Sequence, residues 1–184
     1  MNKPKFLRHL NDIDIENFSN LIKSSNINWN HEFNSMHNRD RDFKNVLSYP
    51  LIDNFKIDDI FLYEKFVNIM SDVIFCCNTV YGPGRFSKIQ ISKVYPNSKV
   101  NPHTDCGFIF LWSHRIHLPI QTNDNVFFNY EDRKINLRKG ELVEVNNLKT
   151  HHVTNENQNN FERIHLIFDY MPEEYYRIYA DLFQ

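Results

Sequence analysis

Two side chains that commonly bind metals stand two positions apart in residues 101–105, Asn-Pro-His-Thr-Asp. In an extended chain, residues i and i+2 point to the same side, so His103 and Asp105 can contact one ion together. A third ligand must come from elsewhere in the chain. His151 and His152, adjacent in a later strand-like segment, are the candidates for it.

Two imidazoles and one carboxylate on one side of an ion leave the opposite coordination positions open. This is the facial arrangement that non-haem Fe(II) oxygenases use, and the same donors also suit Zn²⁺. A His-x-Asp pair is common by chance, so the pair alone does not establish a site. The prediction of a metal centre therefore depends on the polar residues that accompany the pair.

Two further segments carry an Arg-x-His pattern. Arg115 and His117 share one face of a predicted strand, and Arg163 and His165 repeat the arrangement, with the other face of each strand taken by Ile116, Leu118, Ile120, Ile164, Leu166 and Phe168. One solvent-exposed face is normal in an antiparallel sheet. If these faces instead line the inside of a barrel, burying their charge is costly unless an anion or a metal lies there. Two such strands beside a potential metal site favour the second interpretation.

The order of elements indicates a β protein with helices at its ends. Asp58 and Asp59 precede an apolar stripe at helical spacing, residues 62–73, and a Gly-Pro-Gly turn at 82–84 ends that helix. From residue 85 the apolar period becomes two. Strands are expected at 86–95, 99–105, 108–120, 125–130, 141–145, 151–155 and 163–170, with a hairpin at 133–140. Short strands without intervening helices predict an antiparallel barrel or jelly roll.

The remaining segments are expected to support this core. Asn11 or Asp12 is placed to cap a short N-terminal helix, and Pro172 to open a C-terminal helix at 172–183 that carries a stripe of Tyr175, Ile178, Tyr179 and Leu182. Residues 26–57 lack periodicity and are expected to form a surface loop or a substrate wall. The prediction is one domain, 1–184, with helical and irregular support at 1–80 and the β core at 84–170.

Composition limits the partners of the chain. With 184 residues, 41% of them hydrophobic, the chain can bury a substantial core. A net charge of −2 provides no basic field for a nucleic-acid partner. Three cysteines are too few for a disulfide framework, and neither a leader sequence nor a membrane-length apolar run is evident. We expect a cytoplasmic protein with a small-molecule or peptide substrate.

Taken in order, the segments 84–86, 92–96, 100–105, 115–120, 139–141, 151–155 and 163–166 resemble the aspartyl/asparaginyl β-hydroxylase family of Fe(II)/2-oxoglutarate-dependent oxygenases, which includes free-proline hydroxylases. The resemblance covers about half of the chain. It implies a double-stranded β-helix (jelly roll, cupin-like) core with flanking helices. It also implies that His103, Asp105 and His151 bind Fe(II), because the distal ligand of the family stands four residues before an Asn, here Asn155. A bulge could still place His152 there instead.

The same resemblance implies roles for the second group of polar residues. By position, Arg163 corresponds to the residue that binds the distal carboxylate of 2-oxoglutarate, with Ser92 assisting through its hydroxyl group. His117 lies where the family has a His near the inner carboxylate of the cosubstrate. Arg115 is expected to bind a carboxylate of the substrate or of the cosubstrate. His165 is expected to be a core imidazole or a residue behind the ligands.

We therefore expect a dioxygenase that uses Fe(II), 2-oxoglutarate and O₂ to hydroxylate an amino acid, a peptide or protein side chain, or a related small carboxylated substrate. The alternative is a cupin-like barrel that binds a divalent metal and has a non-oxygenase activity or a sensing role. A third hypothesis is a binding module without turnover. Iron-dependent succinate release separates the first hypothesis from the other two.

Overall fold

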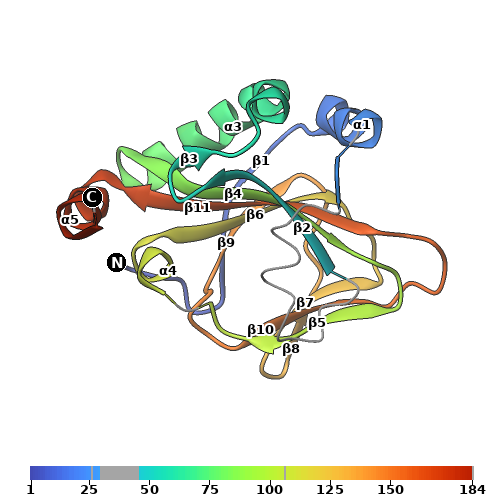
Figure 1. Ribbon diagram of the computed structural model, residues 1–184. Helices are drawn as coiled ribbons and strands as arrows, with labels where there is room; N and C mark the ends of the chain where they lie inside the picture. The colour runs from blue at the N-terminus through green and yellow to red at the C-terminus, as the bar shows by residue number, and fades with distance from the viewer. Residues whose placement is uncertain (26, 30–45, 106, 184) are drawn as a thin grey trace.

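Two antiparallel sheets face each other in the computed structural model, which describes residues 1–25, 27–29, 46–105 and 107–183 (Figure 1). The larger sheet has seven strands, in the order β1 (Leu7–Asp12), β9 (Glu141–Val145), β6 (His114–Gln121), β11 (Arg163–Pro172), β4 (Gly84–Val94), β2 (Val46–Asp53) and β3 (Lys56–Ile57). The smaller has four, in the order β5 (Ser98–His103), β10 (His151–Asn155), β7 (Val126–Tyr130) and β8 (Arg133–Ile135). The predicted jelly roll is confirmed.

Four described helices flank the sheets. α1 (Glu16–Ser24) and α3 (Ile60–Tyr81) cover the outer face of the larger sheet, at the top of Figure 1. α4 (Phe108–Trp112) and α5 (Glu173–Phe183) lie at one end of the sheets, at the left of the same view. None of the described helices is long and apolar enough to cross a membrane.

The central strands β6 and β11 of the larger sheet are buried on both faces. One apolar cluster, which includes Ile91, Ile116 and Leu166, packs between this sheet and the helices. A second cluster, which includes Val94 and Phe128, fills the space between the two sheets. Because side chains alternate along a strand, the neighbours of the first group point into the barrel. All ten residues of β11 are buried for this reason.

The helix predicted after residue 58 is confirmed at its start and along its buried face. The side chain of Asp59 accepts a hydrogen bond from the main-chain N–H of Leu62 at 2.9 Å, as a helix N-cap does. The buried residues of the helix include Leu62, Phe66, Ile69, Met70 and Val73. Gly82, with φ of +79°, ends the helix in a conformation that favours glycine.

The prediction of an N-terminal helix capped by Asn11 or Asp12 is wrong about the cap. Both residues lie in β1, where they pair with β9, and α1 begins only at Glu16. The main-chain N–H of Glu16 instead donates to the side chain of Asp14 at 3.0 Å. Main-chain hydrogen bonds to β9 keep this segment extended as far as Asp12, and local sequence does not reveal that β9 lies beside it.

The expected loop at 26–57 is also wrong for its last part. β2 pairs with both β4 and β3, and it buries Tyr49, Leu51 and Ile52. The alternation is hidden because Pro50 accompanies an irregularity in the pairing with β4 between Pro50 and Ile52. Residues 30–45 lie outside the described part of the chain.

Two other boundaries differ from expectation. The strand predicted at 108–120 is divided, because Gly107 has φ of +122° and turns the chain into α4 before β6 begins at His114. At the C-terminus β11 continues to Pro172 and α5 begins at Glu173. Of the apolar stripe predicted for this helix only Tyr179 is buried.

Candidate active site

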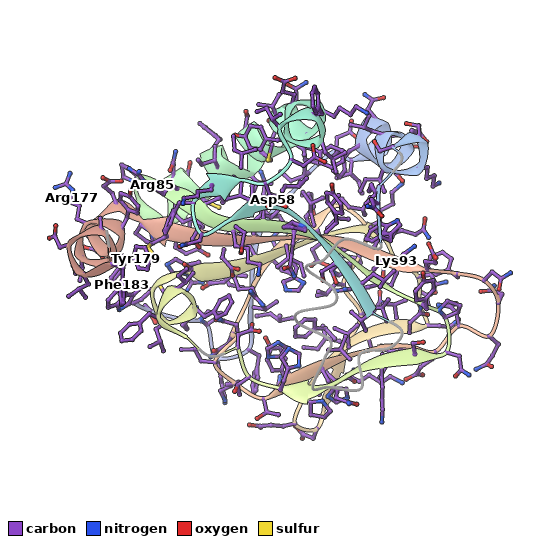
Figure 2. All side chains as sticks on the ribbon, in the orientation of Figure 1. Asp58, Arg85, Lys93, Arg177, Tyr179 and Phe183 are labelled. Carbon is purple, nitrogen blue, oxygen red and sulfur yellow. The ribbon has the colours of Figure 1, made fainter. Side chains whose placement is uncertain are left out.

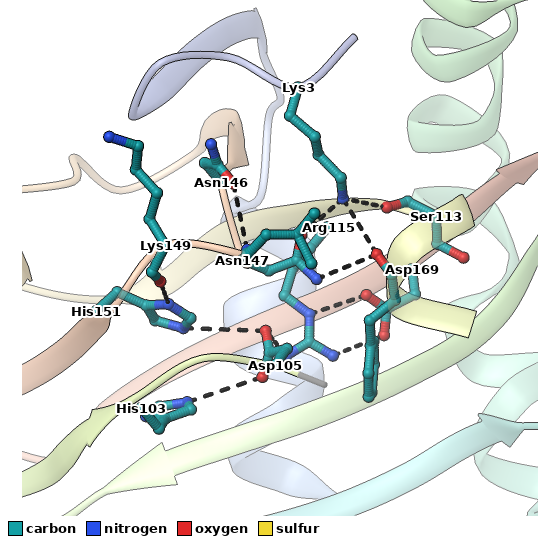
Figure 3. Close-up of polar contacts among 12 residues, drawn as sticks. Lys3, His103, Asp105, Ser113, Arg115, Asn146, Asn147, Lys149, His151 and Asp169 are labelled. Carbon is teal, nitrogen blue, oxygen red and sulfur yellow. Dashed lines mark hydrogen bonds and ion pairs between the residues drawn. The ribbon is translucent and has the colours of Figure 1, made fainter. Parts of the chain in front are cut away.

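Three side chains that could hold a metal ion meet where β5 ends and β10 begins, and they are the candidate ligands (Figure 3). His103 and His151 are register partners on these two antiparallel strands, and Asp105 follows two residues after His103. Nε2 of His103 lies 3.8 Å from Oδ1 of Asp105, and Nε2 of His151 lies 3.9 Å from Oδ2. One ligand atom from each residue lies within 4.8 Å of the others. This spacing suits donors that share one small ion.

Both imidazoles are held by the chain just before them. Nδ1 of His103 lies 2.8 Å from the carbonyl oxygen of Asn101, and Nδ1 of His151 lies 2.8 Å from that of Lys149. A carbonyl oxygen can only accept, so Nδ1 carries the proton in each ring and donates it. In this tautomer Nε2 has a free lone pair on the side of Asp105. A metal-binding histidine needs such a lone pair.

The structure brings His151 to this site and turns His152 away. His151 is buried and its ring stacks on Phe128 with centroids 5.3 Å apart, whereas His152 is only partly buried on the opposite face of β10. Burial lowers the pKa of His151 to about 4, although the charge of Asp105 opposes the shift. His151 is therefore neutral at pH 7, the form that binds metals.

Arg115 holds Asp105 in place. Its Nε and Nη2 each donate to Asp169 at 2.8 Å, and its Nη1 donates to Oδ2 of Asp105 at 2.7 Å. Burial alone would lower the pKa of Arg115, but the two carboxylates outweigh it and raise the pKa. Three of its five N–H groups are thus engaged by carboxylates of the protein, and the expectation that Arg115 binds a substrate or cosubstrate carboxylate stays a prediction. Asp169 was missed, although it continues the alternation of Arg163 and His165 on β11.

Lys3 joins the two segments that carry the site. Its Nζ donates to the carbonyl oxygen of Ser113 and, at 2.6 Å, to the side-chain oxygen of Asn147 (Figure 3). The main-chain N–H of Asp105 donates to the carbonyl oxygen of Asn147 at 2.9 Å. Burial lowers the pKa of Lys3 to about 8. Nothing in the local sequence marks this lysine, since its partners lie more than 100 residues away.

Arg163 is a buried cation whose charge has no described partner. It is 2% exposed and pairs across the sheet with Val94, so it points into the barrel. Neither Nε nor Nη2 has a hydrogen-bond partner among the described residues, and burial lowers the pKa of Arg163 to about 9. A small cavity lies between Arg163, His165 and Thr122, and the hydroxyl group of Thr122 is also buried with no hydrogen-bond partner in the part of the chain that the structure describes. An anion is the ligand that this set of donors fits.

Ser92 and the two other buried histidines surround the same region. Ser92 is two residues before Val94 on the same face of β4, and it lies opposite His165 in register. The rings of His117 and His165 are 5.7 Å apart, and Nδ1 of His117 and both nitrogens of His165 have no hydrogen-bond partner within the described ranges. Burial, and then the charge of Arg163, lowers the pKa of both histidines well below 6.5.

The two groups of polar residues belong to one interior. His117 lies 5.4 Å from the ring of Phe128, and Phe128 stacks on His151. The interior between the three candidate metal ligands and Arg163 therefore contains neutral imidazoles. The Arg-x-His faces point inward, as predicted. Thr122 was missed because a single Thr at the end of a strand carries no recognisable signal.

Solved structures share this fold at low sequence identity. A viral collagen prolyl hydroxylase of Paramecium Bursaria Chlorella virus-1, solved with 2-oxoglutarate, is 10% identical over 91% of this chain and 97% of its own, with a TM-score of 0.54. HygX of Streptomyces hygroscopicus, solved with nickel and 2-oxoglutarate, is 12% identical over 91% of this chain and 82% of its own, with a TM-score of 0.56. A 2OG-Fe(II) oxygenase family protein of Burkholderia pseudomallei is 13% identical over 68% of this chain and 67% of its own, with a TM-score of 0.55.

No curated protein matches the chain. The family model described as Aspartyl/Asparaginyl beta-hydroxylase matches residues 65–172, more than half of the sequence. This range runs from within α3 to the end of β11, so it contains the strands that carry the three candidate metal ligands and Arg163. The chain therefore belongs to the aspartyl/asparaginyl β-hydroxylase family.

Proposed function

We propose that the protein is an Fe(II)- and 2-oxoglutarate-dependent dioxygenase that hydroxylates an amino acid, a peptide or protein side chain, or a related small carboxylated substrate. The observation that carries the proposal is the burial of the charged side chain of Arg163 inside the barrel. A barrel that only binds a divalent metal has no use for a buried guanidinium of which two nitrogens lack partners among the described residues, whereas a dicarboxylate cosubstrate requires a cation at its far end.

One group of residues would bind the metal, and a second group would bind the cosubstrate. His103, Asp105 and His151 would hold Fe(II) on one side, which leaves room opposite them for other ligands. Bound Fe(II), 2-oxoglutarate and O₂ supply the oxidising chemistry that converts a C–H bond into C–OH. Arg115 keeps Asp105 oriented through its third donor.

The cosubstrate site lies deeper in the barrel. Arg163 would bind the distal carboxylate with its planar fork, and the hydroxyl groups of Ser92 and Thr122 would assist. His117, neutral because burial lowers its pKa, can donate or accept a hydrogen bond near the inner carboxylate without adding charge. Two proteins that share the fold support this assignment, since the viral collagen prolyl hydroxylase and HygX were both solved with 2-oxoglutarate.

We also propose that the protein acts in the cytoplasm, where free thiols persist. Cys76 and Cys77 are buried free cysteines on α3, and burial raises the pKa of Cys77, which keeps it an unreactive thiol.

An anaerobic titration tests the function. The metal-free protein receives Fe(II) and then 2-oxoglutarate, and the visible charge-transfer band of the chelate is recorded, followed by succinate release in air. The variant His103→Ala should lose the band, and Arg163→Met should require far more cosubstrate to produce it. The exposed His9, changed to Ala, and the exposed Arg177, changed to Met, are matched controls that should behave as the wild type.

A folded protein that binds Fe(II) but shows neither band nor succinate would contradict the proposal. It would leave the metal-binding barrel with a non-oxygenase activity or a sensing role as the explanation of the three ligands.

A further inference from the structure

A cavity of about 290 Å³ lies at the end of the barrel where α4 and α5 meet the larger sheet. Its walls come from the turn between β2 and β3, the start of β4, α4 and α5, and its chemically distinctive residues are Asp53, Lys88, Phe108, Phe110, Tyr179 and Phe183. Small-molecule sites occupy roughly 300–1,000 Å³, so this volume suits a ligand about as large as an amino acid.

One wall of the cavity is aromatic and partly open to solvent. The rings of Phe108 on α4 and Phe183 on α5 are 5.4 Å apart, and these residues are 56% and 52% exposed. Figure 2 shows Tyr179 and Phe183 on the side of α5 that is turned toward α4. Exposed aromatic rings that line a cavity offer contact area to the apolar part of a ligand.

The part of the cavity wall that comes from β2 and β4 carries a charge pair of unequal burial. The side chain of Lys88 is 13% exposed and that of Asp53 is 49% exposed, with 3.5 Å between Nζ and Oδ1. This distance is longer than that of a strong charge-assisted hydrogen bond, about 2.7–2.9 Å. Burial lowers the pKa of Lys88, and Asp53 opposes the shift. Asp53 can turn into solvent at little cost, so another carboxylate can take its place beside Lys88.

A row of charges connects this cavity with the metal-binding residues. Lys88 is the register partner of Asp169 on β11, and Asp169 is the register partner of Arg115 on β6. Two strand spacings separate Lys88 from Arg115, roughly 10 Å. Arg115 in turn donates to Asp105 at 2.7 Å, and its guanidinium lies 4.6 Å from the ring centroid of Phe110, which also lines the cavity.

We propose that this cavity binds the substrate, and that the substrate is a small monocarboxylate with an apolar or aromatic body. Its carboxylate replaces Asp53 beside Lys88, and its body packs against the aromatic wall, which Phe110 continues toward Arg115. The inference rests on the proposed function, because it gives the oxygenase its substrate class. It makes Lys88 and Asp53 determinants of specificity.

The test uses 3-phenylpropionate as the probe. Calorimetry measures its binding to the full chain, both without metal and with Ni²⁺ and 2-oxoglutarate. The variant Lys88→Met should weaken binding by roughly ten- to a hundredfold, the value of one charge-assisted hydrogen bond. The variant Asp53→Asn should tighten binding, by up to roughly fivefold, because it removes the competing carboxylate. Only a ligand carboxylate that replaces Asp53 beside Lys88 predicts that the two substitutions change the affinity in opposite directions.

Matched controls separate the cavity from its surroundings. Lys56 is exposed in the same hairpin as Asp53, and Lys56→Met should leave the affinity unchanged. Phe183→Ala removes part of the aromatic wall and should weaken binding of the probe. Leu182→Ala changes an exposed neighbour that does not line the cavity, so it should leave the affinity unchanged. The neutral analogue 3-phenyl-1-propanol should bind the wild type and Lys88→Met alike. Circular dichroism confirms that each variant is folded.

The failures of the two proposals are distinguishable. No binding of 3-phenylpropionate in either form, or weaker binding in Asp53→Asn as well as in Lys88→Met, would overturn the substrate site even if the charge-transfer band is present. Binding with the predicted signs but without that band would uphold the cavity as a carboxylate site and reject the oxygenase.

Discussion

Replacing Arg163 by Met is expected to make the protein more stable and unable to bind its cosubstrate. Met has a similar length but no charge, so the change removes the buried guanidinium without leaving a large void. Arg163 is 2% exposed and two of its nitrogens lack partners in the described structure. A side chain that costs stability and has no structural partner is what a binding site for an anion requires.

The magnitude follows from the burial of the charge. Burial lowers the pKa of Arg163 from 12.5 to about 9. At about 1.36 kcal/mol per pKa unit, this corresponds to roughly 5 kcal/mol against the charged form, an upper limit on what the substitution can recover. Replacing buried ions by apolar side chains has stabilised other proteins by about 1–4 kcal/mol. We expect a gain in that range for the protein without metal and cosubstrate.

Urea unfolding measures this gain. With a slope of about 2 kcal/mol per M, a gain of 2 kcal/mol raises the midpoint by roughly 1 M at an unchanged slope. The control Arg177→Met alters an arginine whose side chain is 77% exposed and should move the free energy of unfolding by less than about 0.5 kcal/mol.

Cosubstrate should then offset the stability advantage of the variant. With metal bound, 2-oxoglutarate at 100 times its Kd should stabilise the wild type by about 2.7 kcal/mol and the variant hardly at all. The reasoning is refuted if Arg163→Met unfolds at a lower urea concentration than the wild type in the absence of ligands. That result would mean that the guanidinium is already satisfied in the free protein and awaits no anion.

Three further predictions concern acid stability, packing and the metal site. His117 and His165 have pKa values well below 6.5 in the folded state, so their stabilising effect is complete above pH 6.5 and is lost as the pH falls. In urea unfolding of the metal-free protein below pH 6, each histidine should lower the free energy of unfolding by about 1.4 kcal/mol per pH unit. A constant midpoint from pH 7 to 5 would contradict this. Gly84→Ala would place a Cβ atom 2.5 Å from a main-chain oxygen of β11, so we expect a loss of about 1–3 kcal/mol in the same assay; an unchanged midpoint would show that β11 can shift. Lys3→Met should weaken Co²⁺ binding, followed by visible absorption, by roughly tenfold, whereas Lys5→Met, at an exposed position, should not.

The sequence by itself determined the parts of this protein that depend on local periodicity. The alternation in 115–120 and 163–168 identified which side chains share a face, and the i, i+2 spacing of His103 and Asp105 brought two metal-binding groups together. The helix that begins after Asp59 followed from its cap and its apolar stripe. These features involve residues within a few positions of one another, so the sequence contains all the information that they need.

Only the tertiary structure decided what those faces meet. Whether an Arg-x-His face is wet or buried depends on the smaller sheet, which covers it from a distant part of the chain. The partner of Arg115 on β11 is 54 residues away and that of Lys3 on the loop before β10 is 144 residues away, so no local pattern could assign either. The choice of His151 over His152 required the register of β10 against β5. Long-range pairing fixes these contacts because the chain must first close the barrel before its polar interior exists.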